Sequence, residues 1–187
     1  SFQDTTFYSF LGVLRTVGLK QSDVDAQAAG PTGVWQLVAT GKAHAMAGVP
    51  DWIPPIEQAG VKVKIMPGDR YFPTMAQGIC ASDAAIRDKP AIVRGFVRAS
   101  LKGMKDIMAD PASTARDFAK FVPGMEGKEA YVEAVFRYYG QLVYPGQKIT
   151  GEIDSERMTK LQDFYLESGV IQRKTAVADL FTNQFVQ

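Results

Sequence analysis

Residues 38–66 read VATGKAHAMAGVPDWIPPIEQAGVKVKIM and contain two apolar runs separated by a short proline-containing segment. The run AHAMAGV (43–49) is small and apolar without alternation, as expected of a strand covered on both faces of an α/β sheet. The run VKVKIM (61–66) predicts a second strand. Between them, residues 53–59 fit a short helix, because two prolines fall in its first turn, where missing amide donors cost little. This alternation of helix and strand predicts a largely parallel sheet.

Two amphipathic helices are predicted upstream of these residues. The first begins after Asp4, which stands in an N-cap position, and ends before Gly18. Its apolar residues recur at helical spacing and are Phe7, Phe10, Leu11, Leu14 and Val17. The second opens with GPTG (30–33) and ends at Gly41. The amino-terminal part of the chain is therefore expected to belong to the α/β class.

From Lys89 onward the pattern is almost wholly helical. The first helix of this part has a buried stripe that consists of Ile92, Val93, Phe96, Val97, Leu101, Met104 and Met108. Three further helices are predicted over about 111–122, 131–139 and 154–169. Amphipathic helices need an apolar surface to lie on, and no strand is predicted after Lys89 that would supply one. We therefore expect that part of the fold precedes Ser1.

The composition is that of an ordinary globular chain, with 187 residues of which 46% are apolar and 22% charged. A net charge of +1 provides no electrostatic footprint for nucleic acid or for an anionic membrane. His44 and Cys80 are the only residues of their types, so they form neither an internal disulfide nor a four-ligand zinc site. We expect no metal, no cofactor and no insertion into a membrane, because no apolar run reaches the length of a bilayer span.

Four segments in a fixed order carry a resemblance to a known family. They are DTTFYSFLGVLRTVGL (4–19), LVATGKAHAMAGVPDWIPPIEQAG (37–60), GICASDAAIRDKPAIVRGFVRASLKGMKDIMADP (78–111) and DLFTNQFV (179–186). Their order resembles that of the nitrate, sulfonate and taurine family of periplasmic solute-binding proteins, which includes the related thiamine-precursor receptors. One position departs from the family pattern, because His44 stands where a Gly-x-x-Asp-Ala stretch has its aspartate. This departure puts one loop or hydrogen bond in doubt.

The resemblance implies a type II periplasmic-binding-protein fold, in which two lobes joined by crossing strands close over a ligand like a hinge. Residues 1–74 would form the α/β lobe two, residues 75–82 a hinge or crossing strand, and residues 83–187 the mostly helical remainder of an incomplete lobe one. The implied function is the substrate-binding component of an ABC transporter, which captures a small organic anion or an aromatic or sulfonate-like solute. The implied partner is the membrane permease, and the implied location is periplasmic or lipid-anchored outside the cytoplasm.

Three threonines at predicted helix starts are candidates for ligand binding. Thr5 and Thr6 open the first helix, where free backbone amides and the helix dipole favour an anion and hydroxyls add donors. Thr32 opens the second helix within a stretch that can form an amide nest. Helix capping and ordinary turn chemistry explain these residues equally well. An Asp4 carboxylate that faced the pocket would repel an anion.

Four further candidates lie on predicted loops. Asp51 and Trp52 follow a predicted parallel strand, and ligands of open α/β sheets collect beyond the carboxyl ends of strands. Trp52 can stack on a solute or cover it, and packing in the core is the alternative. Tyr71 and Phe72 fall where the chain returns to lobe one, where they either line the cleft or pack at the hinge. Cys80, in GICAS, is predicted to be a small buried residue.

Two other classes of function compete with a transport receptor. An enzyme related to the thiamine-precursor receptors would need a reactive histidine and a cysteine-rich loop, whereas His44 and Cys80 stand alone. No nucleophile elbow, phosphate-binding loop, dinucleotide fingerprint or His-Glu-x-x-His motif occurs, so we expect no enzyme. A ligand-sensing module on the same fold would be joined to a signalling domain. The flanking sequence would separate sensing from transport.

Overall fold

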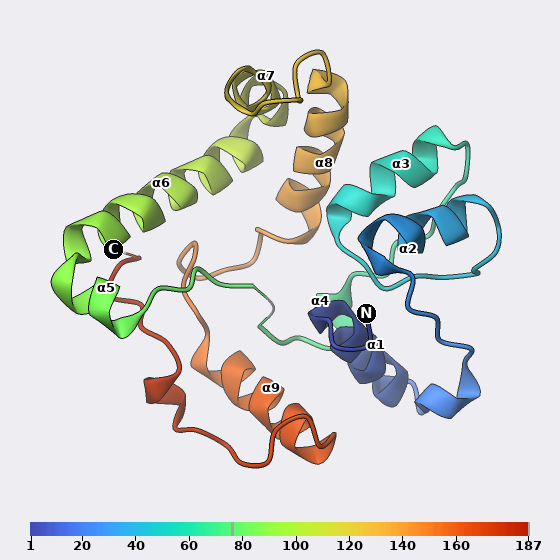
Figure 1. The fold of residues 1–187 in the computed structure, drawn as a ribbon, viewed down its shortest axis with the longest axis horizontal. Helices are drawn as coiled ribbons and strands as arrows, with labels where there is room; N and C mark the ends of the chain where they lie inside the picture. Colours follow the sequence, from blue (N-terminus) through green and yellow to red (C-terminus); the bar gives the residue numbers. More distant parts are fainter. Residues whose placement is uncertain (76, 187) are drawn as a thin grey trace. The chain divides into compact units, whose positions relative to one another are not determined.

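The computed structural model describes residues 1–75 and 77–186, and the chain forms two compact units, Ser1–Pro73 and Thr74–Gln187 (Figure 1). The first unit contains α1 (Thr5–Thr16), η1 (Gln21–Asp23), α2 (Gly30–Ala39), η2 (Pro50–Trp52), α3 (Ile53–Gln58) and α4 (Gly68–Tyr71). The second contains α5 (Asp83–Asp88), α6 (Pro90–Ala109), α7 (Pro111–Phe121), α8 (Glu129–Leu142), α9 (Ser155–Glu167) and η3 (Val177–Asp179).

The predicted parallel sheet of a type II periplasmic-binding-protein fold is wrong for this structure, because the described residues contain helices and loops and no strand. Residues 43–49 and 61–66, predicted as strands, run outside regular structure. A strand requires a neighbour that pairs its N–H and C=O groups, and no described segment pairs with either run. Residues 77–82 of the predicted crossing strand are likewise irregular, and Ala76 lies outside the described residues.

The helices agree well with the sequence pattern. Helix α1 begins after Asp4, whose carboxylate accepts the N–H of Thr6, as predicted for an N-cap. Asp154 caps α9 in the same way by accepting the N–H groups of Glu156 and Arg157. The backbone N–H of Arg157 is the main reason why the pKa of the Asp154 carboxyl is lowered. The single turn of α4 was not predicted, because four residues carry no periodic pattern.

The first unit is held by two helix contacts. Helix α3 packs against α2 and buries Ile53 and Ile56, and the side chain of Ile56 is 1% exposed. Helix α4 packs against α1, which buries Leu14. Neither α3 nor α4 is long enough to be stable by itself in water. Their conformations therefore depend on these contacts.

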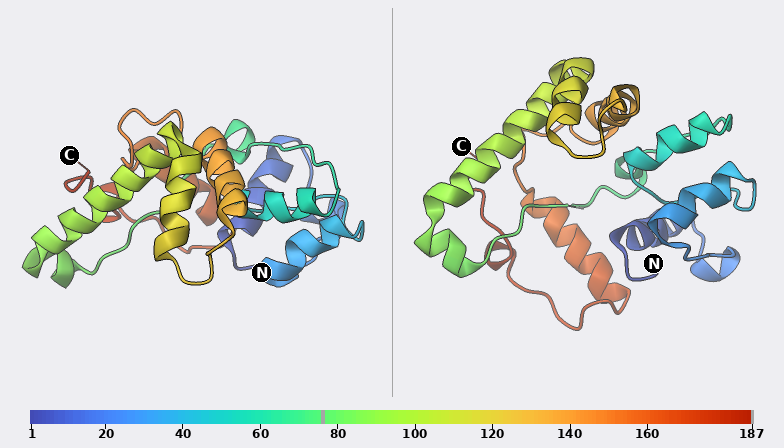
Figure 2. Two further views of the ribbon diagram at one scale, coloured as in Figure 1. Left: turned by 90° about the horizontal axis from the view of Figure 1, so that it is seen from above. Right: turned by 45° about the horizontal axis from the view of Figure 1, so that its top comes forward.

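Helices α6, α7 and α8 form the main packed group of the second unit (Figure 2). Their contact surface buries Val97, Ile107, Ala115, Ala119 and Val132. Gly140 of α8 lies close to α6, because a Cβ atom at this position would be 3.6 Å from the carbonyl oxygen of Ile107. Phe118 of α7 meets Phe136 of α8 edge to face, with ring centroids 5.4 Å apart.

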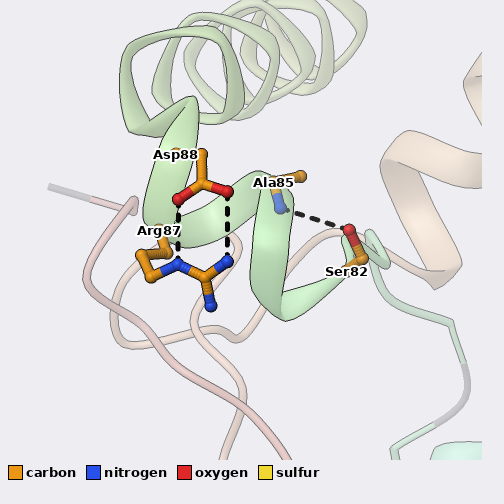
Figure 3. Close-up of polar contacts among 4 residues, drawn as sticks. All are labelled: Ser82, Ala85, Arg87 and Asp88. Carbon is orange, nitrogen blue, oxygen red and sulfur yellow. Dashed lines mark hydrogen bonds and ion pairs between the residues drawn. The ribbon is translucent and has the colours of Figure 1, made fainter.

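Helix α5 makes the turn that leads into α6 (Figure 3). Ser82 caps it by accepting the N–H of Ala85 at 3.2 Å. At its other end the guanidinium of Arg87 donates to both carboxylate oxygens of Asp88, at 2.8 and 3.1 Å (Figure 3). Both side chains are largely exposed, so this pair adds little to stability.

Two side-chain amides attach the carboxyl-terminal segment to the α9 region. Gln162 is buried, donates to the carbonyl of Thr175 at 3.0 Å and accepts the N–H of the same residue at 2.8 Å. Asn183 binds the backbone of Ile153 in the same two-way manner, at 3.0 and 2.9 Å. Each amide thus replaces the backbone partner that a strand would provide in a sheet.

Among the helices of residues 1–75 and 77–186, none combines the length and the apolar character needed to cross a membrane.

We expect Gln162→Ala to lower the free energy of unfolding by about 1–3 kcal/mol, because it removes a buried side chain and the two hydrogen bonds that hold the N–H and C=O of Thr175. Urea denaturation followed by circular dichroism measures this loss. Gln172→Ala is the matched control, since Gln172 is exposed and its loss should change stability by less than about 0.5 kcal/mol. Equal effects of the two substitutions would contradict the assigned role of Gln162.

Candidate functional site

All seven candidate residues lie in the first unit, at four places. They are Thr5 and Thr6 at the start of α1, Thr32 in the first turn of α2, Asp51 and Trp52 in η2, and Tyr71 and Phe72 at the end of α4. Helix contacts place Tyr71 and Phe72 on α1. They place the segment that carries Trp52 next to the packed helices α2 and α3. The candidates thus belong to two packed groups.

At the start of α1, the polar groups are already bonded to one another. The carboxylate of Asp4 accepts the N–H of Thr6 at 2.8 Å and its hydroxyl at 2.7 Å. These two hydrogen bonds lower the pKa of the Asp4 carboxyl, the backbone bond contributing most. Thr5 is exposed beside them. An anion that bound here would have to displace a carboxylate from the helix terminus, so this geometry favours capping for Thr6.

At the end of α4, an aromatic ring lies directly against α1. A Cβ atom on Gly12 would be 2.5 Å from the Cγ atom of Phe72, so only glycine allows this approach. The hydroxyl of Thr16 donates to the carbonyl of Tyr71 at 3.0 Å and to that of Gly12 at 2.9 Å. Tyr71 and Phe72 therefore attach α4 to α1, and both are half-buried.

Thr5 and Thr6, at the start of α1, lie far along the helix from the place where Tyr71 and Phe72 pack on it. Thr5 and Thr16 are separated by 11 residues of one helix, which corresponds to about 16 Å along its axis. Thr5 and Thr6 therefore stand about three turns from the attachment of Tyr71. A small solute that touches both ends of α1 would have to span this length.

The side chain of Trp52 contacts the segment that precedes it in the sequence. A Cβ atom on Gly48 would lie 2.5 Å from Cε3 of the indole and 3.3 Å from the methyl group of Met46. The indole thus rests against the backbone of Gly48, and Trp52 remains half-buried. Its backbone N–H donates to the carbonyl of Val49 at 3.1 Å and closes the turn of η2. Asp51 precedes it and is also half-buried.

Thr32 is exposed in a helix that begins without a side-chain cap. Helix α2 has Ala29 in the N-cap position, and Pro31 in its first turn lacks an N–H group. Since α2 packs against α3, the helix of Thr32 and the segment of Trp52 belong to the same packed group.

Sequence reasoning missed the residues that position the aromatic candidates. Gly12 and Gly48 have no functional group, and their role appears only when a ring lies against them. A signal was present at Gly12, because a glycine within a helical pattern costs about 1 kcal/mol and usually has a packing reason. Thr16 is not among the candidates from the sequence, although its hydroxyl ties α1 to α4.

The remaining reactive residues do not gather. Cys80 is exposed, so the prediction that it is buried was wrong. It lies in a loop of the second unit, whereas His44, also exposed, lies in the first. Within the described parts of the chain, no group of three or more His, Cys, Asp or Glu side chains is placed to hold a metal ion.

Comparison with known proteins gives one family and one curated relative. The family model described as NMT1/THI5 like matches residues 3–114, which include all seven candidate residues. Riboflavin-binding protein RibY of Chloroflexus aurantiacus is 27% identical over an alignment that covers 97% of this chain and 53% of the relative. The chain thus spans about half the length of that relative. No solved structure matches the chain.

We expect Gly12→Ala to destabilise the protein by about 1–2 kcal/mol, because the added methyl group meets the Phe72 ring and overpacking outweighs the gain in helix propensity. Thermal or urea denaturation measures the change. Gly140→Ala is the control, since its Cβ would make only ordinary contacts and the change should stabilise by up to about 1 kcal/mol. A stabilising Gly12→Ala would show that Phe72 does not lie against α1.

We expect the contribution of Asp4 to stability to depend on pH. The folded pKa of Asp4 lies below its ordinary value of 3.8, so the ionised cap stabilises the fold above that pH and loses this effect as pH falls through the lowered pKa. The stability difference between the wild type and Asp4→Ala should be constant from about pH 7 to pH 5 and should shrink below about pH 4. Asp4→Asn, which caps without a charge, should not show this pH dependence. A difference between wild type and Asp4→Ala that persists unchanged below pH 3 would contradict the lowered pKa.

Proposed function

We propose that this chain, which belongs to the NMT1/THI5-like family, forms part of a receptor that binds a small solute and delivers it to an ABC transporter. The receptor performs no chemistry on the solute. Its proposed partner is the membrane permease, and its proposed location is the periplasm or the outer surface of the cell membrane. Membership of the family supports this proposal, together with the name of the curated relative, a riboflavin-binding protein.

The proposed ligand is an aromatic heterocycle of the flavin class. Of the solutes expected from the sequence, the aromatic one gains support from the relative, whereas an anion gains none from the start of α1, where Asp4 already occupies the helix terminus. A flavin ring is large, flat and apolar on both faces. It therefore requires a flat aromatic surface more than it requires a cation.

The half-buried indole of Trp52, in contact with Gly48, is the observation that carries this proposal. The indole lies against Gly48, where a Cβ atom would be 2.5 Å from Cε3, and the side chain is still only half-buried. An indole held by this contact loses little conformational freedom when a second ring stacks on it, so less of the stacking energy is lost in ordering it. Asp51 beside it and Thr32 on the packed α2–α3 pair supply polar groups for the edges of the heterocycle.

The other candidates have a different part in the proposal. Tyr71 and Phe72 are engaged with α1, so we assign to them the positioning of the segment that follows α4. That segment, residues 75–82, is proposed as the hinge between a lobe of residues 1–74 and a lobe of residues 83–187. Thr5 and Thr6 are proposed as secondary contacts, reached by a ligand only where it extends along α1.

We expect the purified protein to bind riboflavin and to quench its fluorescence, because an indole stacked on the flavin ring offers a path for non-radiative decay. Trp52→Ala should weaken binding about tenfold, the loss expected for one aromatic stacking partner. It should leave the melting temperature of the ligand-free protein nearly unchanged, since Trp52 is not in the core. Fluorescence titration and differential scanning fluorimetry measure the two quantities.

The matched control is Trp35→Phe, which changes the other tryptophan of the chain and keeps an aromatic ring. It should leave riboflavin affinity within about twofold of the wild type. Titration with taurine tests the anionic alternative in the same assay. Binding of taurine without binding of riboflavin would reject the flavin class, and equal losses from both tryptophan variants would reject the role of Trp52.

A further inference from the structure

Met46 lies beside Trp52, on the segment that leads into η2. The methyl carbon of Met46 and atom Cε3 of the indole are 3.3 and 2.5 Å from the point where a Cβ atom of Gly48 would stand. Because both distances are measured from one point, the two carbon atoms are at most about 6 Å apart, and at such a separation a thioether lies next to an aromatic ring. Both side chains therefore approach Gly48 from the side on which it has only a hydrogen atom.

The position between these two side chains is open to solvent. Gly48 is exposed, whereas Met46 and Trp52 are half-buried. The buried apolar side chains of the first unit include Leu14, Ile53 and Ile56, and Met46 is not among them. The surface here is thus an exposed piece of backbone bordered by a thioether and an indole, and each of the two leaves apolar area available to a flat solute.

The ring system of a flavin is larger than an indole. An indole has two fused rings and a flavin has three, so an indole stacked on a flavin leaves part of the ring system without an apolar partner. Apolar area that stays in contact with water adds nothing to affinity. A second apolar group at the border of the indole would cover this remaining part.

A methionine side chain is well suited to that task. It is unbranched and has three rotatable bonds, so it adapts its position to the edge or the face of a ring. Its polarisable sulfur makes favourable contacts with aromatic systems. Met46 is also the one large apolar side chain between Ala43 and Gly48, so no other residue of that stretch offers a comparable surface.

We propose that Met46 is a second contact for the bound solute, an inference that rests on the proposed function and on its flavin-class ligand. The indole of Trp52 stacks on one part of the ring system, and the thioether of Met46 covers the part that extends beyond the indole. Gly48 lies between them and contributes no side chain that would hold the solute away from either group.

Titration of the purified protein with riboflavin tests this contact. Met46→Ala should weaken binding about threefold to tenfold, the loss expected when one sulfur–aromatic contact is removed. Met46→Leu keeps most of the apolar surface and should lose less than Met46→Ala. The matched control is Met66→Ala, because Met66 is the same residue type in the same unit and is 55% exposed. It should leave riboflavin affinity within about twofold of the wild type.

The melting temperature of the ligand-free protein separates a contact from a packing role. Met46→Ala should leave it nearly unchanged, because Met46 lies outside the buried core. A decrease of more than about 5 °C would correspond to a clear loss of stability. Such a decrease would place Met46 in the packing of the first unit and would overturn the proposal.

A double-mutant cycle with Trp52→Ala separates direct contact from positioning of the indole. If Met46 contacts the solute itself, Met46→Ala should still weaken riboflavin binding about threefold or more in the Trp52→Ala background. If Met46 only held the indole in place, Met46→Ala would have no further effect in that background. This second result would overturn the proposal.

Failure of this inference is distinguishable from failure of the proposed function. Weaker binding in Trp52→Ala together with unchanged binding in Met46→Ala would overturn the role of Met46 and leave the flavin-binding receptor standing. Absence of riboflavin binding in the wild type would overturn both.

Discussion

Contact between an aromatic ring and a glycine backbone is the interaction on which the first unit depends. Phe72 lies against Gly12 and thereby holds the single turn of α4 on α1, whereas α3 is held on α2 by the buried side chains of Ile53 and Ile56. Helices of four and six residues do not persist in water, because nucleation costs more than so few hydrogen bonds return. The Phe72 ring supplies the apolar contact that makes the turn of α4 persist, and a Cβ atom on Gly12 would remove it.

The same contact separates two aromatic candidates that look alike in the sequence. Phe72 is used within the fold, between α4 and α1, and its neighbour Tyr71 is bonded through its carbonyl to Thr16. Trp52 lies against Gly48 of the segment that leads to it and stays half-buried. This difference is why the proposed flavin contact falls on Trp52. The proposed receptor function rests on the family, whose model matches residues 3–114.

Predictions from the sequence were accurate for the long helices and wrong for the strands. The N-caps Asp4 and Asp154, and the helical spacing of the apolar residues after each of them, placed α1 and α9 nearly at their observed bounds. Residues 43–49 and 61–66 have the composition of strands but not the conformation. Ile92 and Phe96 matched the helical period and were assigned to the buried stripe, yet they are exposed, because periodicity gives the faces of a helix and not which face is covered.

The sequence by itself determined where the helices lie, because a helix satisfies its N–H and C=O groups within one segment and a cap within a few residues. It also determined the residue types available for a site. Only the tertiary structure decided that the strand-like runs remain unpaired, that Gly12 and Gly48 seat aromatic rings, and that α6 has an uncovered face. Strand pairing, ring contacts and burial all require a second segment, and its position is not written in the local pattern of residues.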